Sequence, residues 1–288
     1  MVQLGPNRYG KAETHVVHVA RGGAPDGGDL VTDRTVSTSL SGELAATHLT
    51  GDNSAVLATD TQKNTAFVFA KTLGAVPAEA YALALAEHFV STQQPITRAR
   101  VHVAEASWTR SGAHSFCRSG AATRTTTVVL DADLGASVVS GVEDLVVLNT
   151  TNSEFWGFPR DEYTTLAETK DRILATEVSA RWRYRGVDVE WTDAYGAARA
   201  ALADAFADTY SYSLQQTLFA IGTRIVESVP DICEVRLALP NKHHFLVDLA
   251  PFGLSNDNEV YWAADRPYGL IEGTVLADDA PPEGLAWV

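Results

Sequence analysis

One order of predicted secondary structure occurs twice along the 288-residue chain, and this repeat limits the possible folds more than any other sequence feature. In the first half, stretches of alternating apolar and polar residues flank two stretches with helical spacing. The predicted order is two strands, two helices and two strands, at His15–Arg21, Val36–Leu49, Thr59–Leu73, Pro77–Gln93, Arg98–Arg110 and Arg124–Asp133.

The second half follows the same order, with a long segment rich in aromatic and charged residues after its first strand. Strands and helices are predicted at Ser137–Asn149, Glu177–Trp191, Thr192–Thr209, Ser213–Val229, Cys233–Leu239, Phe245–Pro251 and Glu259–Ala264. Thr192 is expected to cap the first of these helices, and Pro230 to end the second. The last stretch, Ala277–Val288, is acidic and contains prolines, which is typical of a tail.

The repeat predicts an α+β fold made of two tandem ββααββ units, residues 1–136 and 137–288. A helix pair inside an antiparallel meander places helices on one face of the sheet. The other face then needs cover. Closing the sheets of several copies into a shared barrel would supply that cover and would remove exposed sheet edges.

Charge and composition narrow the possible partners. The chain has 22 Lys and Arg against 36 Asp and Glu, a net charge of −14, which argues against nucleic acid or an anionic membrane as a partner. Its only cysteines, Cys117 and Cys233, exclude a disulfide framework and a Cys-rich zinc site. No apolar run is long enough for a membrane span, and neither a signal peptide nor a Ser-Lys-Leu ending occurs. Cytoplasm is therefore the expected location, and the excess of 17 Arg over 5 Lys is typical of a GC-rich bacterial genome.

The standard catalytic signatures HExxH, GxSxG, Walker A and GxGxxG do not occur in the sequence. Five polar clusters remain, and each one alone has an ordinary structural explanation. Tyr9–Lys11 can be explained by a solvated lysine, and Ala58–Thr65 by a helix N-cap. Asn152–Asp161 can be an aromatic core patch, Ser213–Thr217 a weak helix cap and Pro240–Phe245 a tight turn.

Taken together, the motifs YGK, ATDTQKNT, TNSEFWGFPRDEYTTL, DRILAT, LQQT and NKHHFLVDL closely resemble the urate oxidase family. The resemblance extends from Tyr9 to Gly269, and the motifs follow the family's order. It implies the tunnelling fold (T-fold), with two ββααββ units per chain, helices on the outer face, and a homotetramer assembled around a barrel-like tunnel.

The resemblance also implies roles for individual residues. Lys11 and Thr59 match the family's proton-handling dyad, and His243 matches the histidine that completes the relay. Among the substrate-binding positions, Phe155 matches the ring that stacks on the purine, and Arg172 and Gln215 match the side chains that bind its rim. Asn241 matches the amide that, with Thr59, holds oxygen or water. Asp60 and Leu214 match positions that act through backbone N–H groups. In the family the Lys–Thr side and the Phe–Arg–Gln side come from different subunits, so an isolated monomer is expected to be inactive.

These residue types suit a planar anionic substrate. A guanidinium gives bidentate, charge-assisted hydrogen bonds that a lysine could not reproduce, and an amide offers both a donor and an acceptor. Leu214 and Gln215 begin a predicted helix, where free N–H groups favour an anion. The resemblance implies oxidation of urate by O2 and water to 5-hydroxyisourate and hydrogen peroxide without a metal or organic cofactor.

Two alternatives remain open at the level of sequence. A T-fold enzyme acting on pterins is one, although the zinc-dependent members need a His/Cys cluster that is not apparent here; metal content would identify it. The other is a paralogue that binds purines without chemistry. It would bind urate without consuming O2, and it would have no need for the set Lys11, Thr59 and His243.

Overall fold

The computed structural model describes residues 2–264 and 266–288. The elements in chain order are β1 (Tyr9–Ala20), β2 (Leu30–Gly42), α1 (Ala45–Thr50), α2 (Thr59–Leu73), α3 (Ala78–Thr92), β3 (Ile96–Arg110), β4 (Phe116–Asp131), β5 (Gly135–Asn149), β6 (Leu174–Tyr184), α4 (Trp191–Asp208), α5 (Leu214–Ser228), β7 (Ile232–Pro240), β8 (His243–Leu246), the 3-10 turn η1 (Ala250–Phe252), β9 (Tyr261–Ala264) and β10 (Leu270–Leu276).

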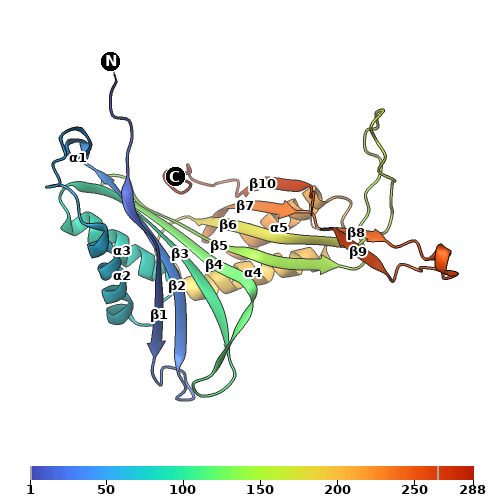
Figure 1. The fold of residues 1–288 in the computed structure, drawn as a ribbon, viewed down its shortest axis with the longest axis horizontal. Coiled ribbons are helices and arrows are strands. Elements are labelled where there is room, and N and C mark those ends of the chain that lie inside the picture. The colour runs from blue at the N-terminus through green and yellow to red at the C-terminus, as the bar shows by residue number, and fades with distance from the viewer. Residues whose placement is uncertain (1, 265) are drawn as a thin grey trace.

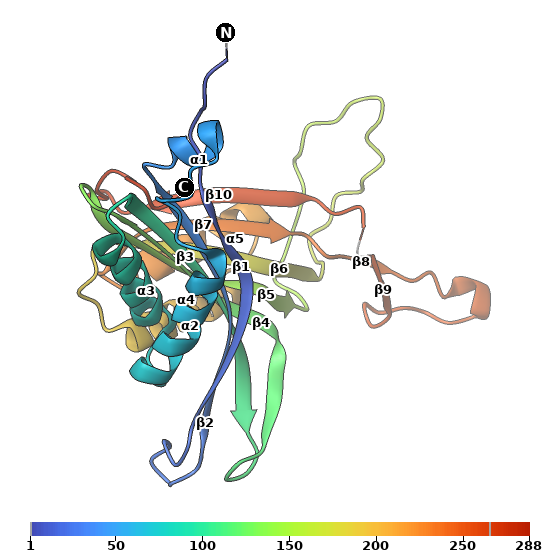
Figure 2. The same cartoon turned by 60° about the vertical axis from the view of Figure 1, so that its left-hand side comes forward.

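Within the described residues, eight antiparallel strands form one continuous main sheet in the order β1-β2-β3-β4-β5-β6-β7-β10 (Figure 1). Helices α2 to α5 lie on one face of it (Figure 2), which confirms the predicted α+β class. The main sheet is open in a single chain, with β1 and β10 as its edges. β4 and β5 pair across the predicted boundary at residue 136, and the division into two units stays a prediction.

Helices α2 and α5 lie where the sequence predicts, to within one residue at each end. α2 spans Thr59–Leu73 and stops at Gly74, whose φ of 72° is readily adopted by glycine. α5 begins after Ser213, whose hydroxyl accepts a hydrogen bond from the backbone N–H of Gln216 at 3.2 Å. Ser213 therefore fixes the start of the helix that carries Leu214 and Gln215.

Four expectations were wrong in detail. The strand predicted at Phe245–Pro251 is observed as β8, which ends at Leu246, and residues 250–252 form the 3-10 turn η1. The second predicted strand ends at Gly42 instead of Leu49, because a Cβ at Gly42 would overlap Pro95 and the register with β3 shifts there; helix α1 follows. The strand predicted to reach Trp191 ends at Tyr184. Glu190, and not Thr192, is the N-cap of α4, since the Trp191 ring packs edge-on against Tyr184 at a centroid distance of 5.0 Å.

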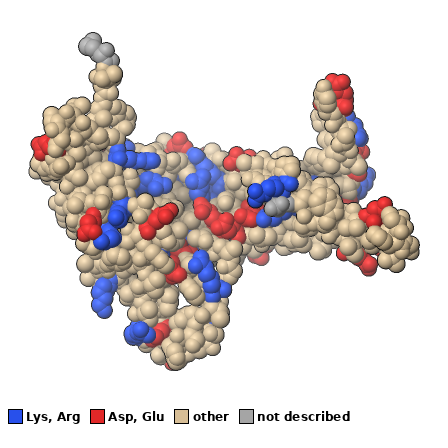
Figure 3. Space-filling model, viewed as in Figure 1, with Lys and Arg blue, Asp and Glu red and all other residues tan. Residues whose placement is uncertain are grey.

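The predicted acidic tail is packed against the protein. Strand β10, which was not predicted, leads into it, and Ala286 is 4% exposed. Arg236 lies 4.0 Å from the Trp287 ring centroid and pairs with Glu283 at 2.6 Å. Val235 and Leu237, on either side of Arg236 in β7, belong to the core on the helix side of the sheet, so the Arg236 side chain lies on the opposite face. The tail that contacts Arg236 therefore covers part of that face. Figure 3 shows basic and acidic side chains interspersed over the side of the protein seen in Figure 1.

A buried ion pair joins the two halves on the helix side of the main sheet. Glu79 of α3 is fully buried and accepts hydrogen bonds from Arg124 of β4 at 2.6 Å and from Ser140 of β5 at 2.5 Å. Arg124 also stacks on Tyr195 of α4, 4.0 Å from its ring centroid. Burial, and secondarily the Glu79 carboxylate, raises the pKa of Tyr184 to about 12. Glu79 thus connects both helix pairs.

Glu79→Ala should destabilise the protein strongly, because it leaves the largely buried guanidinium of Arg124 without its carboxylate. Removing one partner of a buried pair costs about 3–5 kcal/mol. Urea unfolding followed by circular dichroism would measure the change. Glu87→Ala, at an exposed position of the same helix, is the matched control and should unfold like the parent protein. Equal midpoints for the two variants would contradict the role given to Glu79.

Candidate active site

Lys11 is positioned by an irregularity in the edge strand β1. The register of β1 with β2 shifts between Lys11 and Thr14, and Glu13 has a φ of 54°. A side chain at position 10 would overlap the carbonyl oxygen of Thr38, so the motif YGK needs glycine there. The backbone N–H of Lys11 donates to the Thr38 hydroxyl at 3.3 Å.

Thr59 and Asp60 form the first turn of α2, which packs against β1. The cap expected from one of these side chains is absent, since Ala58 holds the N-cap position with no side-chain hydrogen bond. Asp60 instead accepts hydrogen bonds from Lys63 at 2.5 Å and Asn64 at 3.0 Å. The Lys63 bond is the main cause of the lowered pKa of Asp60, and the charge of Lys11 contributes to it. Lys11 is therefore near the start of α2.

Phe155 and Arg172 lie in the long segment between β5 and β6. The segment doubles back on itself: Phe155 and Thr169 exchange backbone hydrogen bonds at 2.8 and 3.0 Å, and the Arg172 N–H donates to the Ser153 carbonyl at 3.0 Å. This pairing places the Arg172 guanidinium carbon 5.2 Å from the Phe155 ring centroid. Burial lowers the pKa of Arg172, which stays a cation.

The same segment docks on the start of α5. The Glu154 N–H donates to the Ser211 carbonyl at 2.7 Å, and the Ser211 N–H donates to the Asn152 carbonyl at 2.9 Å. Leu214 is buried and Gln215 is exposed, both in the first turn of α5. The arginine, the aromatic ring and the helix N-terminus thus belong to one connected region.

Asn241 and His243 reach this region from the chain between β7 and β8. Asn241 forms a β-bridge with Thr176 on β6, and its N–H donates to the Gly269 carbonyl at 2.8 Å. His243 begins β8 and stacks on Phe245. Burial lowers the pKa of His243, and the positive charges of Arg172 and His244 lower it further. His243 is therefore a neutral imidazole at neutral pH, able to accept a proton.

The predicted residues form two groups in a single chain. The first group contains Lys11, Thr59 and Asp60; the second contains Phe155, Arg172, Leu214, Gln215, Asn241 and His243. Figure 1 shows β1 and α2 at one end of the main sheet and β8 with the 150–173 segment towards the other. No hydrogen bond or ion pair between described residues joins the groups, so one chain alone does not assemble the predicted site.

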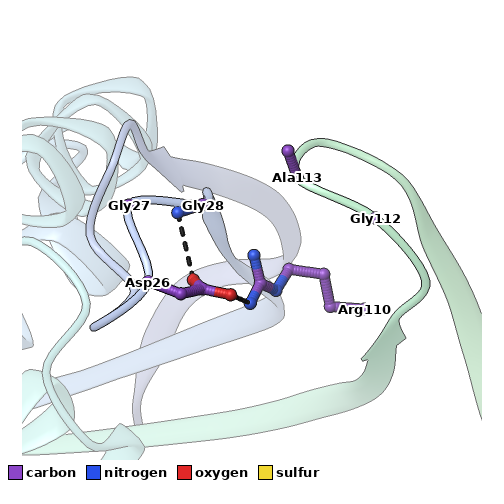
Figure 4. Close-up of a pocket in the computed structure, with 6 residues that line it drawn as sticks. All are labelled: Asp26, Gly27, Gly28, Arg110, Gly112 and Ala113. Carbon is purple, nitrogen blue, oxygen red and sulfur yellow. Dashed lines mark hydrogen bonds and ion pairs between the residues drawn. The ribbon is translucent and has the colours of Figure 1, made fainter.

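The surface of one chain has hollows away from the predicted site residues. One of about 330 Å³ opens between the β1–β2 and β3–β4 turns, where Arg110 pairs with Asp26 (Figure 4). The Asp26 carboxylate also accepts a hydrogen bond from the Gly28 N–H at 3.1 Å. None of the predicted site residues lines it.

Arg172 has no carboxylate partner among the described residues, unlike the largely buried arginines Arg34, Arg124 and Arg183. Arg34 pairs with Glu105, Arg124 with Glu79, and Arg183 with Glu234. The Arg172 Nε donates to the Ser153 hydroxyl at 3.1 Å, and no described residue accepts from its Nη atoms. That edge of the guanidinium can therefore bind a planar anion in a bidentate manner, with the Phe155 ring beside it.

Sequence reasoning missed two supporting residues. Lys63, the partner of Asp60, could have been found from its i,i+3 spacing on the predicted helix. Ser153 lies within a motif that was singled out, but no sequence pattern indicates that its hydroxyl meets Arg172, nineteen positions later. That contact depends on the fold of the 150–173 segment.

The chain is similar to known proteins over nearly its whole length. The family model Uricase matches residues 7–129 and 138–272. Uricase from Arthrobacter globiformis is 46% identical, covering 99% of this chain and 94% of that protein, and uricase from Dictyostelium discoideum is 40% identical, covering 96% and 98%.

Solved structures agree with these matches. A crystal structure of Arthrobacter globiformis uricase superposes with a TM-score of 0.95 at 45% identity, covering 100% of this chain and 99% of that one. A urate oxidase structure from Bacillus sp. TB-90 has a TM-score of 0.79 at 22% identity, with coverage of 94% and 100%, and shows the same fold.

Replacing Arg172 by glutamine should raise the pKa of His243 towards its ordinary value, because a positive charge next to the imidazole is removed. The variant would then hold more protonated His243 in mildly acidic solution. NMR titration of histidine-labelled protein measures this, with a His243→Asn variant identifying the signal. Arg160→Gln removes an exposed arginine of the same segment and should leave the pKa unchanged. An unchanged His243 pKa in Arg172→Gln would show that the two side chains do not interact.

Proposed function

The chain belongs to the uricase family, and we propose that its two groups of site residues meet between subunits to form the centre at which urate is oxidised. The protein is a urate oxidase, an oxidoreductase of purine catabolism. The observation that carries the proposed centre is the free guanidinium edge of Arg172 beside the Phe155 ring and the start of α5.

In this proposal, the second group binds the substrate. Arg172 and Gln215 hold the rim of the urate anion, and Phe155 stacks on its ring. The backbone N–H of Leu214, at the start of α5, donates to the anion, and that of Asp60 does so from the start of α2. The net charge of −14 does not prevent the chain from binding an anion. Dissolved salt screens charges more than about 8–10 Å away, so the positive charge within the site acts on the anion more strongly than the acidic residues elsewhere on the surface.

The first group, together with His243, moves protons. Lys11 and Thr59 take a proton from bound urate, and neutral His243 completes the relay. The resulting electron-rich dianion gives two electrons to O2, which Thr59 and Asn241 hold over the ring. The reduced O2 takes up two protons and leaves as hydrogen peroxide. Water then adds to the two-electron-oxidised purine, giving 5-hydroxyisourate. Because urate itself supplies the electrons, the proposed reaction requires no metal or organic cofactor.

The proposed assembly is a homotetramer with shared sites and a central tunnel. The separation of the two groups in one chain supports it, and so do the open edges of the main sheet. Large apolar side chains are also exposed over several elements, at Phe67, Val68, Tyr163, Phe219 and Trp262. Each proposed unit, 1–136 and 137–288, supplies one helix pair and four strands of the main sheet.

Location and further partners stay predictions. No helix in the described part of the chain is long and apolar enough to cross a membrane. The cytoplasmic location is supported by the similarity to a bacterial relative, and urate and O2 are the proposed partners in the reaction.

Chelator-treated protein mixed with urate in air should consume urate and O2 in equal amounts and release hydrogen peroxide. Purine absorbance and an oxygen electrode, read together, measure this. Dependence on added metal would overturn the cofactor-free mechanism. Binding of urate by the tetramer without loss of O2 would favour a purine-binding paralogue.

Lys11→Met should lower kcat by about 10²–10⁴-fold and leave urate binding largely intact, since it removes a proton-transfer group. Arg172→Ala should instead raise KM by about 10–100-fold, because it removes charge-assisted hydrogen bonds. Steady-state kinetics of both variants tests the division of roles. Near-normal turnover in Lys11→Met would show that the dyad is wrongly assigned.

Unfolding the two variants together and refolding them should restore about a quarter of the parent activity at urate concentrations well below the parent KM, because one quarter of randomly shared sites draw Lys11 from an Arg172→Ala subunit and Arg172 from a Lys11→Met subunit. Each variant refolded alone is the control. No recovery in mixed tetramers confirmed by size measurement would mean that each site is built from one chain.

A further inference from the structure

Three buried hydroxyl residues connect Arg172 with the start of α5. Ser153, Ser211 and Thr217 are all fully buried. They come from separate parts of the chain: the 150–173 segment, the α4–α5 connection and the second turn of α5. Buried hydroxyls are costly unless hydrogen-bonded, so a cluster of three in one place needs an explanation.

Ser153 holds Arg172 at two points. Its carbonyl accepts the Arg172 backbone N–H at 3.0 Å, and its hydroxyl accepts the Arg172 Nε–H at 3.1 Å. The first bond fixes where the side chain begins, and the second fixes the rotation of the planar guanidinium. With Nε occupied, the Nη1/Nη2 edge points away from Ser153.

Ser211 and Thr217 tie Ser153 to the start of α5. Residues 153 and 211 form a parallel β-bridge. The Thr217 hydroxyl donates to the Ser211 hydroxyl at 2.8 Å, and the Ser211 hydroxyl donates to the Ser213 carbonyl at 3.1 Å. These contacts therefore hold the Arg172 guanidinium at a fixed position relative to the backbone N–H groups of Leu214 and Gln215.

The choice of serine at position 153 matters electrostatically. The shielded arginines Arg34, Arg124 and Arg183 are fixed by carboxylates, which cancel their charge. A hydroxyl accepts one guanidinium N–H, which restrains the orientation of the side chain, and leaves its positive charge available to a ligand. Arg172 is the arginine that the proposed function requires to be both rigid and uncompensated.

We propose that Ser153 is a positioning residue for urate. Its hydroxyl sets the orientation of Arg172, and the hydrogen-bonded Ser211–Thr217 pair keeps Arg172 at a fixed position relative to α5. This inference rests on the proposed function of the site. Ser153 itself does not touch the substrate. It acts by holding the binding edge of Arg172 free and correctly turned.

Ser153→Ala should raise the KM for urate about 10-fold and change kcat by less than about threefold, because one hydrogen bond to a charged group is lost while the proton relay is intact. The dissociation constant of urate under anaerobic conditions should rise equally. Ser153→Cys, a weaker acceptor, should give an intermediate KM and provides a second variant if the alanine protein does not assemble. A parent-like KM in both variants would overturn the proposal.

Ser140→Ala is the matched control. Ser140 is also a buried serine bonded to a charged side chain, Glu79, but it lies outside the site. Its loss should lower the unfolding midpoint and leave the urate KM unchanged. An equal rise of KM in the two serine variants would show that Ser153 acts only through general stability.

A double variant separates positioning from a direct contact with substrate. In an Arg172→Ala background, Ser153→Ala should cause no further loss of urate affinity, since the group it positions is gone. Additive losses would overturn the proposal.

The pKa of His243 gives a readout that does not depend on turnover. It should rise in Ser153→Ala if the guanidinium moves away, and an unchanged value would mean that Arg172 had kept its place. If the parent protein fails to oxidise urate, the proposed function falls, and this titration still tests the contact between Ser153 and Arg172.

Discussion

Helices α2 to α5 cover one face of the main sheet and leave the other face and the edge strands β1 and β10 without such cover. This one-sided packing determines most of what the protein can do. The apolar side chains of both halves merge into a single core on the helix side, and Glu79 with Arg124 lies where the halves meet. The sheet is too wide for its two ends to meet within one chain. Lys11 and Thr59 therefore stay apart from Arg172 and His243, and the proposed centre needs a second copy to bring them together.

Much of this organisation could be predicted from the sequence, because it depends on local patterns. Helix α2 was predicted to the residue, and α5 to within one residue at each end, since Gly74 and Ser213 are local signals. Errors occur where tertiary packing decides. Trp191 begins α4 because its ring packs on Tyr184, and β2 ends at Gly42 because Pro95 approaches closely. The predicted tail is held by arginines of β6 and β7, which its acidic composition alone does not indicate.

For the candidate site, sequence motifs identified the residues but not how they are held. Thr59 or Asp60 was expected to cap α2, but neither does, and Asp60 instead pairs with Lys63. Ser153 was part of a recognised motif without a role. Such contacts join residues through a folded segment, and no spacing rule predicts them. The same holds for the depressed pKa of His243, which depends on burial and on Arg172, more than seventy positions earlier in the chain.

Both groups of the proposed centre rely on backbone and hydroxyl contacts to place their cations. Lys11 is set by a strand irregularity and by the close approach of Gly10 to the Thr38 carbonyl, and Arg172 by the hydroxyl and carbonyl of Ser153. Carboxylates do this work elsewhere in the chain, where the purpose is stability and the charge can be cancelled. A centre that binds an anion cannot use that solution, since the partner would compete with the ligand. Uncharged anchors allow a strongly acidic protein to keep a positive site, because only the local field acts on a bound anion.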